Sequence, residues 1–356
     1  MTRTILSEHL AARGARFGEY GGAETASSFG DPQAEFSALR SASGVFDLGW
    51  RAKLAASGVD RVRWMNGMVT GNVRDLAPNR GAYSFLLNPQ GHILGDLYIY
   101  NRGDHLLLDT DCFQAPRLRE VFEKYIIMDD VEVTDISEKL TAIGLRGPNA
   151  SAVLEKCGVN AGPLHPLELR DATFGDAGIS LVRAAGRDFG CEIWLAPQNA
   201  PRVWDALVAA GAAPVGTEAL EWWRIAAGMP RYGQDIRERD LPQETEQHQA
   251  LDFSKGCYVG QEIVERIRSR GQVHRKFTGF RLKNAGAGAG GAAPGTKIQS
   301  EGKDVGELTS VASLPQTNGT RQTIALGYVR REFTLHPKEL KAGEAAVTVA
   351  ELPFAL

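Results

Sequence analysis

The strongest constraint on the fold is a pair of apolar segments joined by a tight turn. Residues 83–87 and 93–100 are strand-like, and Asn88-Pro89-Gln90-Gly91 between them is typical of a β-hairpin. A third strand is expected at 106–108, followed by helical spacing of apolar residues over 115–127. Connections this short join antiparallel neighbours, because a parallel crossover needs roughly a dozen residues or more. The sequence therefore predicts an antiparallel sheet accompanied by helices.

The segments on either side of this block are also strands and helices. Asp31 and Pro32 predict the start of a helix over 31–43, because aspartate caps helices and proline suits their first turn. Gly44 ends that helix, and residues 45–56 are expected to form one strand. A second block follows, with strands expected at 140–145, 179–182 and 192–195 and helices at 148–157, 200–210 and 217–227.

Beyond residue 276 the pattern changes to short strands separated by glycines, which is typical of a small β-barrel. These strands are expected at 277–282, 296–299, 305–311, 324–329 and 346–349. The predicted fold class is α+β, with antiparallel-sheet α+β domains and a small C-terminal β-barrel. The expected domains are residues 1–50 with 140–250, an inserted antiparallel α+β domain at 51–139, a motif segment at 251–275 and the barrel module at 276–356.

Composition excludes several classes of protein. The 356 residues include 40 basic and 43 acidic ones, so no bulk charge points to nucleic acid or to a membrane surface. No apolar run predicts a signal peptide or a membrane span. The four cysteines are scattered and the seven histidines lack metal-ligand spacing, which argues against a disulfide framework and a metal site. We expect a cytoplasmic monomer.

The segment 255–262, Lys255-Gly256-Cys257-Tyr258-Val259-Gly260-Gln261-Glu262, carries a thiol between two glycines. Glycines let the backbone approach a ligand closely. A nearby lysine and a following helix favour the thiolate, which is the reactive form. The alternative is that Cys257 is a small, inert residue in a tight turn.

This octapeptide resembles the motif of the YgfZ family, folate-binding relatives of the aminomethyltransferase (T-protein) of the glycine cleavage system in the GcvT superfamily. The segments 44–48, 87–93, 146–150 and 227–233 also resemble motifs of that superfamily. The resemblance implies a three-domain ring whose central channel holds tetrahydrofolate or a one-carbon derivative. It also implies a role in the upkeep of iron–sulfur enzymes that depends on Cys257.

Three folate contacts follow from the same resemblance. Glu192 is similar to the family glutamate that accepts hydrogen bonds from the pterin, although its glycine-rich lead-in, 186–190, is shorter than in the family. Tyr83 resembles a tyrosine beside the folate, and Arg224 an arginine near it. The alternatives are a solvent-facing strand glutamate for Glu192 and structural packing for the other two.

The family's aminomethyltransferases carry two adjacent aspartates after the hairpin turn, of which the first is catalytic. Here the pair is Gly95-Asp96. Neighbouring side chains on a strand point to opposite faces, so Asp96 is not expected to replace its missing neighbour. This difference predicts no glycine-cleavage activity.

A glycine-rich stretch at 286–291 matches the dinucleotide-binding pattern, but Ala292-Ala293-Pro294-Gly295 after it does not open a helix, so we interpret it as a loop. Three hypotheses remain. The first is a tetrahydrofolate-binding accessory protein for iron–sulfur cluster assembly or repair, whose partners are folate and iron–sulfur proteins or their assembly factors, without direct binding of nucleic acid or membrane. The second is a folate-dependent aminomethyl or methyl transferase, and the third a non-enzymatic scaffold.

Overall fold

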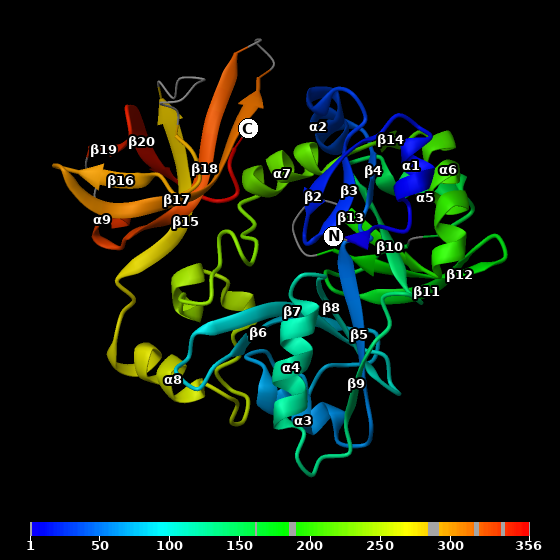
Figure 1. The fold of residues 1–356 in the computed structure, drawn as a ribbon, viewed down its shortest axis with the longest axis horizontal. Helices are drawn as coiled ribbons and strands as arrows, with labels where there is room; N and C mark the ends of the chain where they lie inside the picture. Colours follow the sequence, from blue (N-terminus) through cyan, green and yellow to red (C-terminus); the bar gives the residue numbers. More distant parts are fainter. Residues whose placement is uncertain are drawn as a thin grey trace. The chain divides into compact units, whose positions relative to one another are not determined.

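The computed structural model describes residues 2–160, 162–184, 190–283, 292–316, 320–335 and 339–355 (Figure 1). It divides into two compact units. The first comprises residues 1–84 and 96–220, and the second comprises 85–95 and 221–356. Within the described ranges, no helix combines the length and apolar character needed to cross a bilayer.

The first unit contains a small N-terminal sheet and a six-stranded sheet. The small sheet has the order β1 (Thr2–Arg3), β3 (Ala23–Ser28), β2 (Arg16–Tyr20). The larger has the order β11 (Leu169–Phe174), β12 (Ala177–Arg183), β13 (Gly190–Leu195), β10 (Thr141–Arg146), β4 (Gly44–Asp47), β14 (Ala213–Pro214). The accompanying helices are α1 (Ser7–Ala11), α2 (Pro32–Ser41), α5 (Ala150–Lys156), the 3-10 helix η1 (Pro197–Asn199) and α6 (Ala200–Ala209). Ile193 of β13 and Trp204 of α6 belong to one buried core.

A five-stranded sheet forms the rest of the first unit, apart from the hairpin tip at 85–95, which belongs to the second. Its order is β6 (Gly81–Leu87), β7 (Ile93–Asn101), β8 (Leu106–Asp111), β5 (Arg51–Ser57), β9 (Glu132–Asp135). The β7–β8 pair is antiparallel, as its short connection predicted, and the long-range pairs β5–β8 and β5–β9 are antiparallel too. Helices α3 (Arg61–Met68) and α4 (Ala115–Tyr125) pack together through Trp64 and Phe122, whose ring centroids are 5.5 Å apart.

The second unit is built on a closed six-stranded barrel, coloured yellow to red in Figure 1. Its order is β15 (Arg275–Lys283), β18 (Arg321–Arg330), β17 (Lys303–Pro315), β16 (Lys297–Ser300), β19 (Leu340–Ala342), β20 (Ala345–Ala350). Also present are α7 (Thr217–Ala226), which begins in the first unit, η2 (Pro242–Thr245), η3 (His248–Ala250), α8 (Gln261–Arg270) and α9 (Glu332–Leu335). The predicted α+β class with a C-terminal barrel is confirmed.

The strand predicted at 45–56 was wrong as a single element. It is divided between β4 in the six-stranded sheet and β5 in the five-stranded sheet. A turn separates them, because Asp47 Oδ1 accepts from the Gly49 amide at 2.8 Å and the Arg51 amide donates to the Leu48 carbonyl at 2.9 Å. The predicted cap of α2 is confirmed, since Asp31 accepts from the Gln33 amide at 2.9 Å. The glycine-rich stretch at 286–291 and residues 186–189 lie outside the described residues.

Candidate functional site

One face of the five-stranded sheet carries buried charges. Arg51 and Lys53 of β5 lie directly opposite Asp111 and Asp109 of β8. Lys53 Nζ donates to Asp109 Oδ1 at 2.7 Å, and Arg51 Nη2 to Asp109 Oδ2 at 2.6 Å. Arg51 also pairs with Asp111. Lys53 has no exposed surface and Asp109 is 2% exposed, so these charges are stabilised by one another rather than by water.

Asp96 of β7 lies on the same sheet and is held by neutral donors. The Tyr83 hydroxyl donates to Asp96 Oδ2 at 2.7 Å, and Gln114 Nε2 donates to Oδ1 at 2.8 Å. The Asp96 amide donates to Gln114 Oε1 at 3.1 Å. Burial and the Asp96 charge raise the pKa of Tyr83 far above its usual value, so its hydroxyl remains a donor. The contact fixes both the carboxylate and the predicted folate-side tyrosine.

Glu192 lies on β13, which belongs to the six-stranded sheet of the same unit. Trp194 Nε1 donates to Glu192 Oε2 at 2.7 Å. The Trp194 ring packs edge-to-face on Tyr100, with centroids 5.1 Å apart, and Lys53 Nζ lies 4.9 Å from its centroid. Burial and the charge of Asp109 raise the pKa of the half-buried Glu192. The glutamate therefore faces a buried ion-pair network and not open solvent.

Tyr98 lies on the same face of β7 as Asp96, two residues along the strand. It lies opposite Asp109 in the β7–β8 ladder, and its ring is 5.0 Å from that of Tyr83. Burial raises its pKa, and Asp96, Asp109 and Glu192 act in the same direction. We use the name polar cluster for the residues Arg51, Lys53, Tyr83, Asp96, Tyr98, Tyr100, Asp109, Asp111, Gln114, Glu192 and Trp194.

Position 95 lies on the other face of β7. Ile93, Gly95 and Leu97 are buried, whereas Asp96 and Tyr98 are half-buried, so burial alternates along the strand. The opposite orientation of neighbouring residues is as predicted. However, a side chain at 95 would join the apolar face, and Asp96 is the residue that contacts Tyr83. Glycine at position 95 therefore does not remove the carboxylate that β7 contributes to the polar cluster, because that carboxylate belongs to Asp96.

Four charged residues of this site were not predicted from the sequence: Arg51, Lys53, Asp109 and Asp111. The available signal was their spacing, since Arg51-x-Lys53 and Asp109-x-Asp111 repeat charge with the period of a strand. Such alternation usually indicates a solvent-exposed face. Here Lys53, Asp109 and Asp111 are buried and Arg51 is half-buried. Burial is tolerated because opposite charges on neighbouring strands are in register.

Arg224 makes its hydrogen bonds within the second unit. Its guanidinium donates to Asp235 Oδ2 at 2.6 Å, to the Met229 carbonyl at 2.6 Å and to Ser310 Oγ at 2.8 Å. Nε donates to Glu221 at 2.9 Å. A buried guanidinium needs such partners, and they tie α7 to barrel strand β17. The folate contact predicted for Arg224 stays a prediction.

The octapeptide packs against the hairpin turn in the second unit. Gly260 precedes α8 with φ +82°, and a Cβ there would lie 2.6 Å from the Asn88 carbonyl oxygen. Gly91 in the turn has φ +77°, and a Cβ there would lie 2.8 Å from Ile263 Cβ. The structure thus brings together two segments that the sequence singled out separately, and both glycines permit the close approach.

Cys257 lies in an irregular segment between the buried side chains of Lys255 and Tyr258. Lys255 is 9% and Tyr258 8% exposed, and Lys255 Nζ lies 5.1 Å from the Tyr258 ring centroid. Cys257 itself is exposed, whereas Cys191 is buried and Cys112 and Cys157 are intermediate. Within the described ranges, no three histidine, cysteine or acidic side chains are grouped to hold a metal ion.

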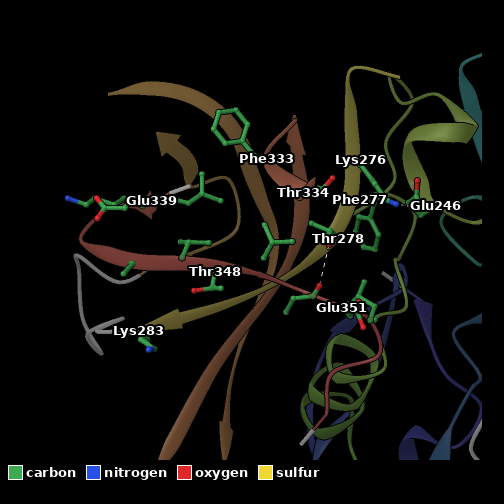
Figure 2. Close-up of a pocket in the computed structure, with 18 of the residues that line it drawn as sticks. Glu246, Lys276, Phe277, Thr278, Lys283, Phe333, Thr334, Glu339, Thr348 and Glu351 are labelled. Carbon is green, nitrogen blue, oxygen red and sulfur yellow. Dashed lines mark hydrogen bonds and ion pairs between the residues drawn. The ribbon is translucent and has the colours of Figure 1, made fainter. Parts of the chain in front are cut away.

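A groove of 1320 Å³ runs along β20 on the barrel (Figure 2). Lys276, which pairs with Glu246 at 2.8 Å, lies at one end, and Lys283 and Glu339 lie at the other. Phe277, Phe333, Leu340, Val347 and Val349 supply its apolar lining. Among the described residues that line it there is no member of the polar cluster or of the octapeptide.

Comparison with known proteins places these features in a family context. The family model described as GCVT N-terminal domain matches residues 6–255. The chain is 31% identical over 337 residues to an aminomethyltransferase of Rubrobacter xylanophilus, covering 93% of this chain and 88% of that protein. It is 28% identical over 356 residues to an aminomethyltransferase of a Picosynechococcus species, covering 98% and 93%.

A solved structure shares the fold. The crystal structure of glycine cleavage system aminomethyltransferase T from Bartonella henselae matches with a TM-score of 0.87 and 22% identity. The match covers 99% of this chain and 98% of that one. At this identity the likeness shows the fold alone.

Proposed function

This chain belongs to the GCVT N-terminal domain family, and from that membership and the polar cluster we propose that it is a folate-dependent one-carbon transferase. The names of its relatives favour transfer of an aminomethyl group. The proposed ligand is tetrahydrofolate or a one-carbon derivative. The observation that carries the proposal is the Asp96 carboxylate, held by Tyr83 and Gln114 in the same cluster as Glu192.

The residues of the polar cluster fit a pterin. A pterin presents an amino group and a ring N–H side by side, and a carboxylate accepts from such a pair through both of its oxygens. Glu192 is half-buried, and its Oε2 already accepts one hydrogen bond from Trp194, which holds the side chain in one orientation. Tyr98, which is half-buried, supplies aromatic surface for a flat ring, and the buried rings of Tyr83 and Tyr100 pack beside it and beside Trp194.

Asp96 supplies the acid–base group of the proposed reaction. An amine that forms a new carbon–nitrogen bond must lose a proton, and a positioned carboxylate can accept it. Tyr83 and Gln114 each donate to one oxygen of Asp96, so among the described residues the carboxylate is held by neutral hydrogen bonds, without a direct ion pair that would hinder proton transfer. Bound tetrahydrofolate would supply the nitrogen that accepts the one-carbon group.

The test is turnover with the other components of the glycine cleavage system. We expect the wild-type protein to form methylenetetrahydrofolate. Asp96→Asn should lower the rate on the order of a hundredfold or more, as for loss of a general base, while tetrahydrofolate still binds in calorimetry. If the wild-type protein binds tetrahydrofolate but shows no turnover, the transferase proposal is wrong and the expectation drawn from Gly95 is correct.

A second candidate is the tetrahydrofolate-binding accessory protein for iron–sulfur cluster assembly or repair. The observation that favours it is the exposed Cys257 between the buried side chains of Lys255 and Tyr258. A thiol presented on an anchored turn suits a contact with a partner protein. A non-enzymatic scaffold, the third possibility, has no specific observation in its favour.

Complementation separates the accessory role from the other two. In cells that require this protein for iron–sulfur enzyme activity, Cys257→Ser should abolish support, and the matched variant Cys157→Ser should not. Both variants should bind tetrahydrofolate like the wild type. Full support by Cys257→Ser would exclude thiol chemistry and leave the octapeptide a structural turn.

A further inference from the structure

We propose that Trp194 is a positioning residue for Glu192 and that Lys53, against the indole ring, strengthens this effect. The inference rests on the proposed function in that Glu192 is taken as the residue that accepts hydrogen bonds from the pterin. It adds that the orientation and the charge of the Glu192 carboxylate depend on Trp194, two residues along β13, and on Lys53 of the five-stranded sheet.

The geometry places the indole between a cation and an anion. Lys53 Nζ is 4.9 Å from the ring centroid, and the ring N–H donates to Glu192 Oε2 at 2.7 Å. Trp194 is 1% exposed and is packed edge-to-face on Tyr100, so the ring has little freedom to turn. Lys53 is in turn fixed by Asp109 at 2.7 Å. The carboxylate is therefore oriented by a chain of buried contacts.

The lysine also affects the strength of the hydrogen bond. A cation over an indole face draws electron density from the ring, which makes the N–H a better donor. A stronger donor favours the ionised form of its acceptor. Since only the ionised glutamate accepts from two ligand donors, orientation and charge are supplied by the same pair of residues.

Other charged groups act on Glu192, and the pH dependence reflects all of them. Burial and Asp109 of β8 oppose ionisation, whereas Lys53 and Arg51 of β5 and the Trp194 hydrogen bond favour it. Further titratable groups that interact with Glu192 in the described part of the chain are Tyr98 and Tyr100 of β7 and Cys191 of its own strand. These three are neutral near pH 7 because their pKa values are raised, so they do not titrate in the range of the test.

The test compares two tryptophan-to-phenylalanine variants. Trp194→Phe keeps an aromatic ring between Lys53 and Tyr100 but removes the donor to Glu192. Trp204→Phe is the matched control, because Trp204 is fully buried and its ring N–H has no hydrogen-bond partner among the described residues. Lys53→Gln removes the cation and retains an N–H donor for Asp109. Tetrahydrofolate affinity is measured by calorimetry without oxygen between pH 5 and pH 9.

We expect Trp194→Phe to bind several-fold to about tenfold more weakly at pH 7 and to recover part of this loss at pH 9, because the orienting hydrogen bond is absent at every pH. As the pH falls, Trp194→Phe should lose binding at a higher pH than the wild type does, because its Glu192 protonates more readily. Lys53→Gln should raise the pH at which binding is lost even further, and Trp204→Phe should leave that pH unchanged. A Trp194→Phe profile that coincides with the wild type overturns the inference, and so does an equal, pH-independent loss in both tryptophan variants. Absence of binding by the wild-type protein contradicts the proposed function instead.

Discussion

At the scale of single residues, burial opposes the ionised form of Glu192. Burial and the Asp109 charge raise its pKa, so its ionised form costs folding free energy once the pH exceeds the pKa of the unfolded state. Removal of this charge should therefore stabilise the fold at pH 7. We predict that Glu192→Gln raises the melting temperature at pH 7 and leaves it almost unchanged near pH 3, well below the unfolded-state pKa of 4.5, where the carboxyl is protonated in both states.

The same variant should bind tetrahydrofolate more weakly, because a neutral amide accepts less strongly than a carboxylate and offers one acceptor oxygen. Loss of a charged acceptor costs about 1.5–3 kcal/mol, roughly tenfold or more in affinity. Calorimetry measures the expected loss of affinity, and thermal melting measures the expected gain in stability. Glu155→Gln, on the exposed surface of α5, is the control and should change neither quantity. A Glu192→Gln protein that melts at a lower temperature at pH 7 would show that the attraction of Glu192 to Lys53 and Arg51 outweighs the effect of burial.

At the scale of elements, Gly260 determines how α8 meets the hairpin turn. We predict that Gly260→Ala destabilises the protein by roughly 2–5 kcal/mol. About 1–2 kcal/mol comes from the left-handed backbone at φ +82°. About 1–3 kcal/mol more comes from overlap, because the new Cβ would lie 2.6 Å from the Asn88 carbonyl oxygen and 2.9 Å from Leu87 Cβ. Urea unfolding measures the loss.

Gly302 provides the matched control. It has φ +76° in the turn between β16 and β17, and a Cβ there meets nothing within 4 Å. Gly302→Ala should therefore show only the backbone contribution, about 1–2 kcal/mol. Equal losses in the two variants would mean that the turn and α8 separate without cost, which would contradict close packing of the two motifs.

The barrel contains an acid-sensitive ion pair. Glu307 accepts from Arg237 Nη1 at 2.6 Å and from Lys297 Nζ at 2.5 Å. Although burial opposes ionisation, these partners lower the pKa of Glu307 to about 2 from its ordinary 4.5. A depressed folded-state pKa contributes stability above the unfolded value that is lost as the pH falls from 4.5 towards 2. Glu307→Gln should be less stable than the wild type at pH 7, and unfolding in urea should show the difference shrinking towards pH 2.

The elements themselves differ in how far the sequence predicts them. The hairpin, the barrel strands and the Asp31 cap follow from local turn and capping chemistry, and the structure contains them. The division of residues 45–56 into β4 and β5 was missed, because Asp47, Gly49 and Trp50 form a turn inside an apolar run with no proline or asparagine–glycine pair. The buried charges of the polar cluster were missed because burial depends on strand register. The sequence does not show that register, since β5 and β8 are separated by about fifty residues.

At the scale of the whole molecule, the four thiols lie in different environments. Burial and the Glu192 charge raise the pKa of Cys191 to about 12. Burial also raises the pKa of Cys112 and of Cys157, which are half-buried and donate to the carbonyls of Gly21 and Ala206. Cys257 is the exposed one of the four. The thiolate is the nucleophile and must also be reached by the reagent, so exposure favours reaction of Cys257, whereas burial and raised pKa values slow the other three thiols.

We therefore predict that iodoacetamide at pH 7.5 alkylates Cys257 first, Cys112 and Cys157 at least tenfold more slowly, and Cys191 only when the protein unfolds. Burial that raises a thiol pKa lowers its thiolate fraction, and restricted access slows the reaction further. Mass spectrometry of peptides from timed samples gives the four rates, and the same protein in urea provides the reference in which the rates converge. Early labelling of Cys191 would show that β13 opens in the folded protein, which would also remove the fixed environment that Glu192 and Trp194 require. Slow labelling of Cys257 would show that the turn carrying it is covered in solution, and the accessory role built on its exposure would then lose its support.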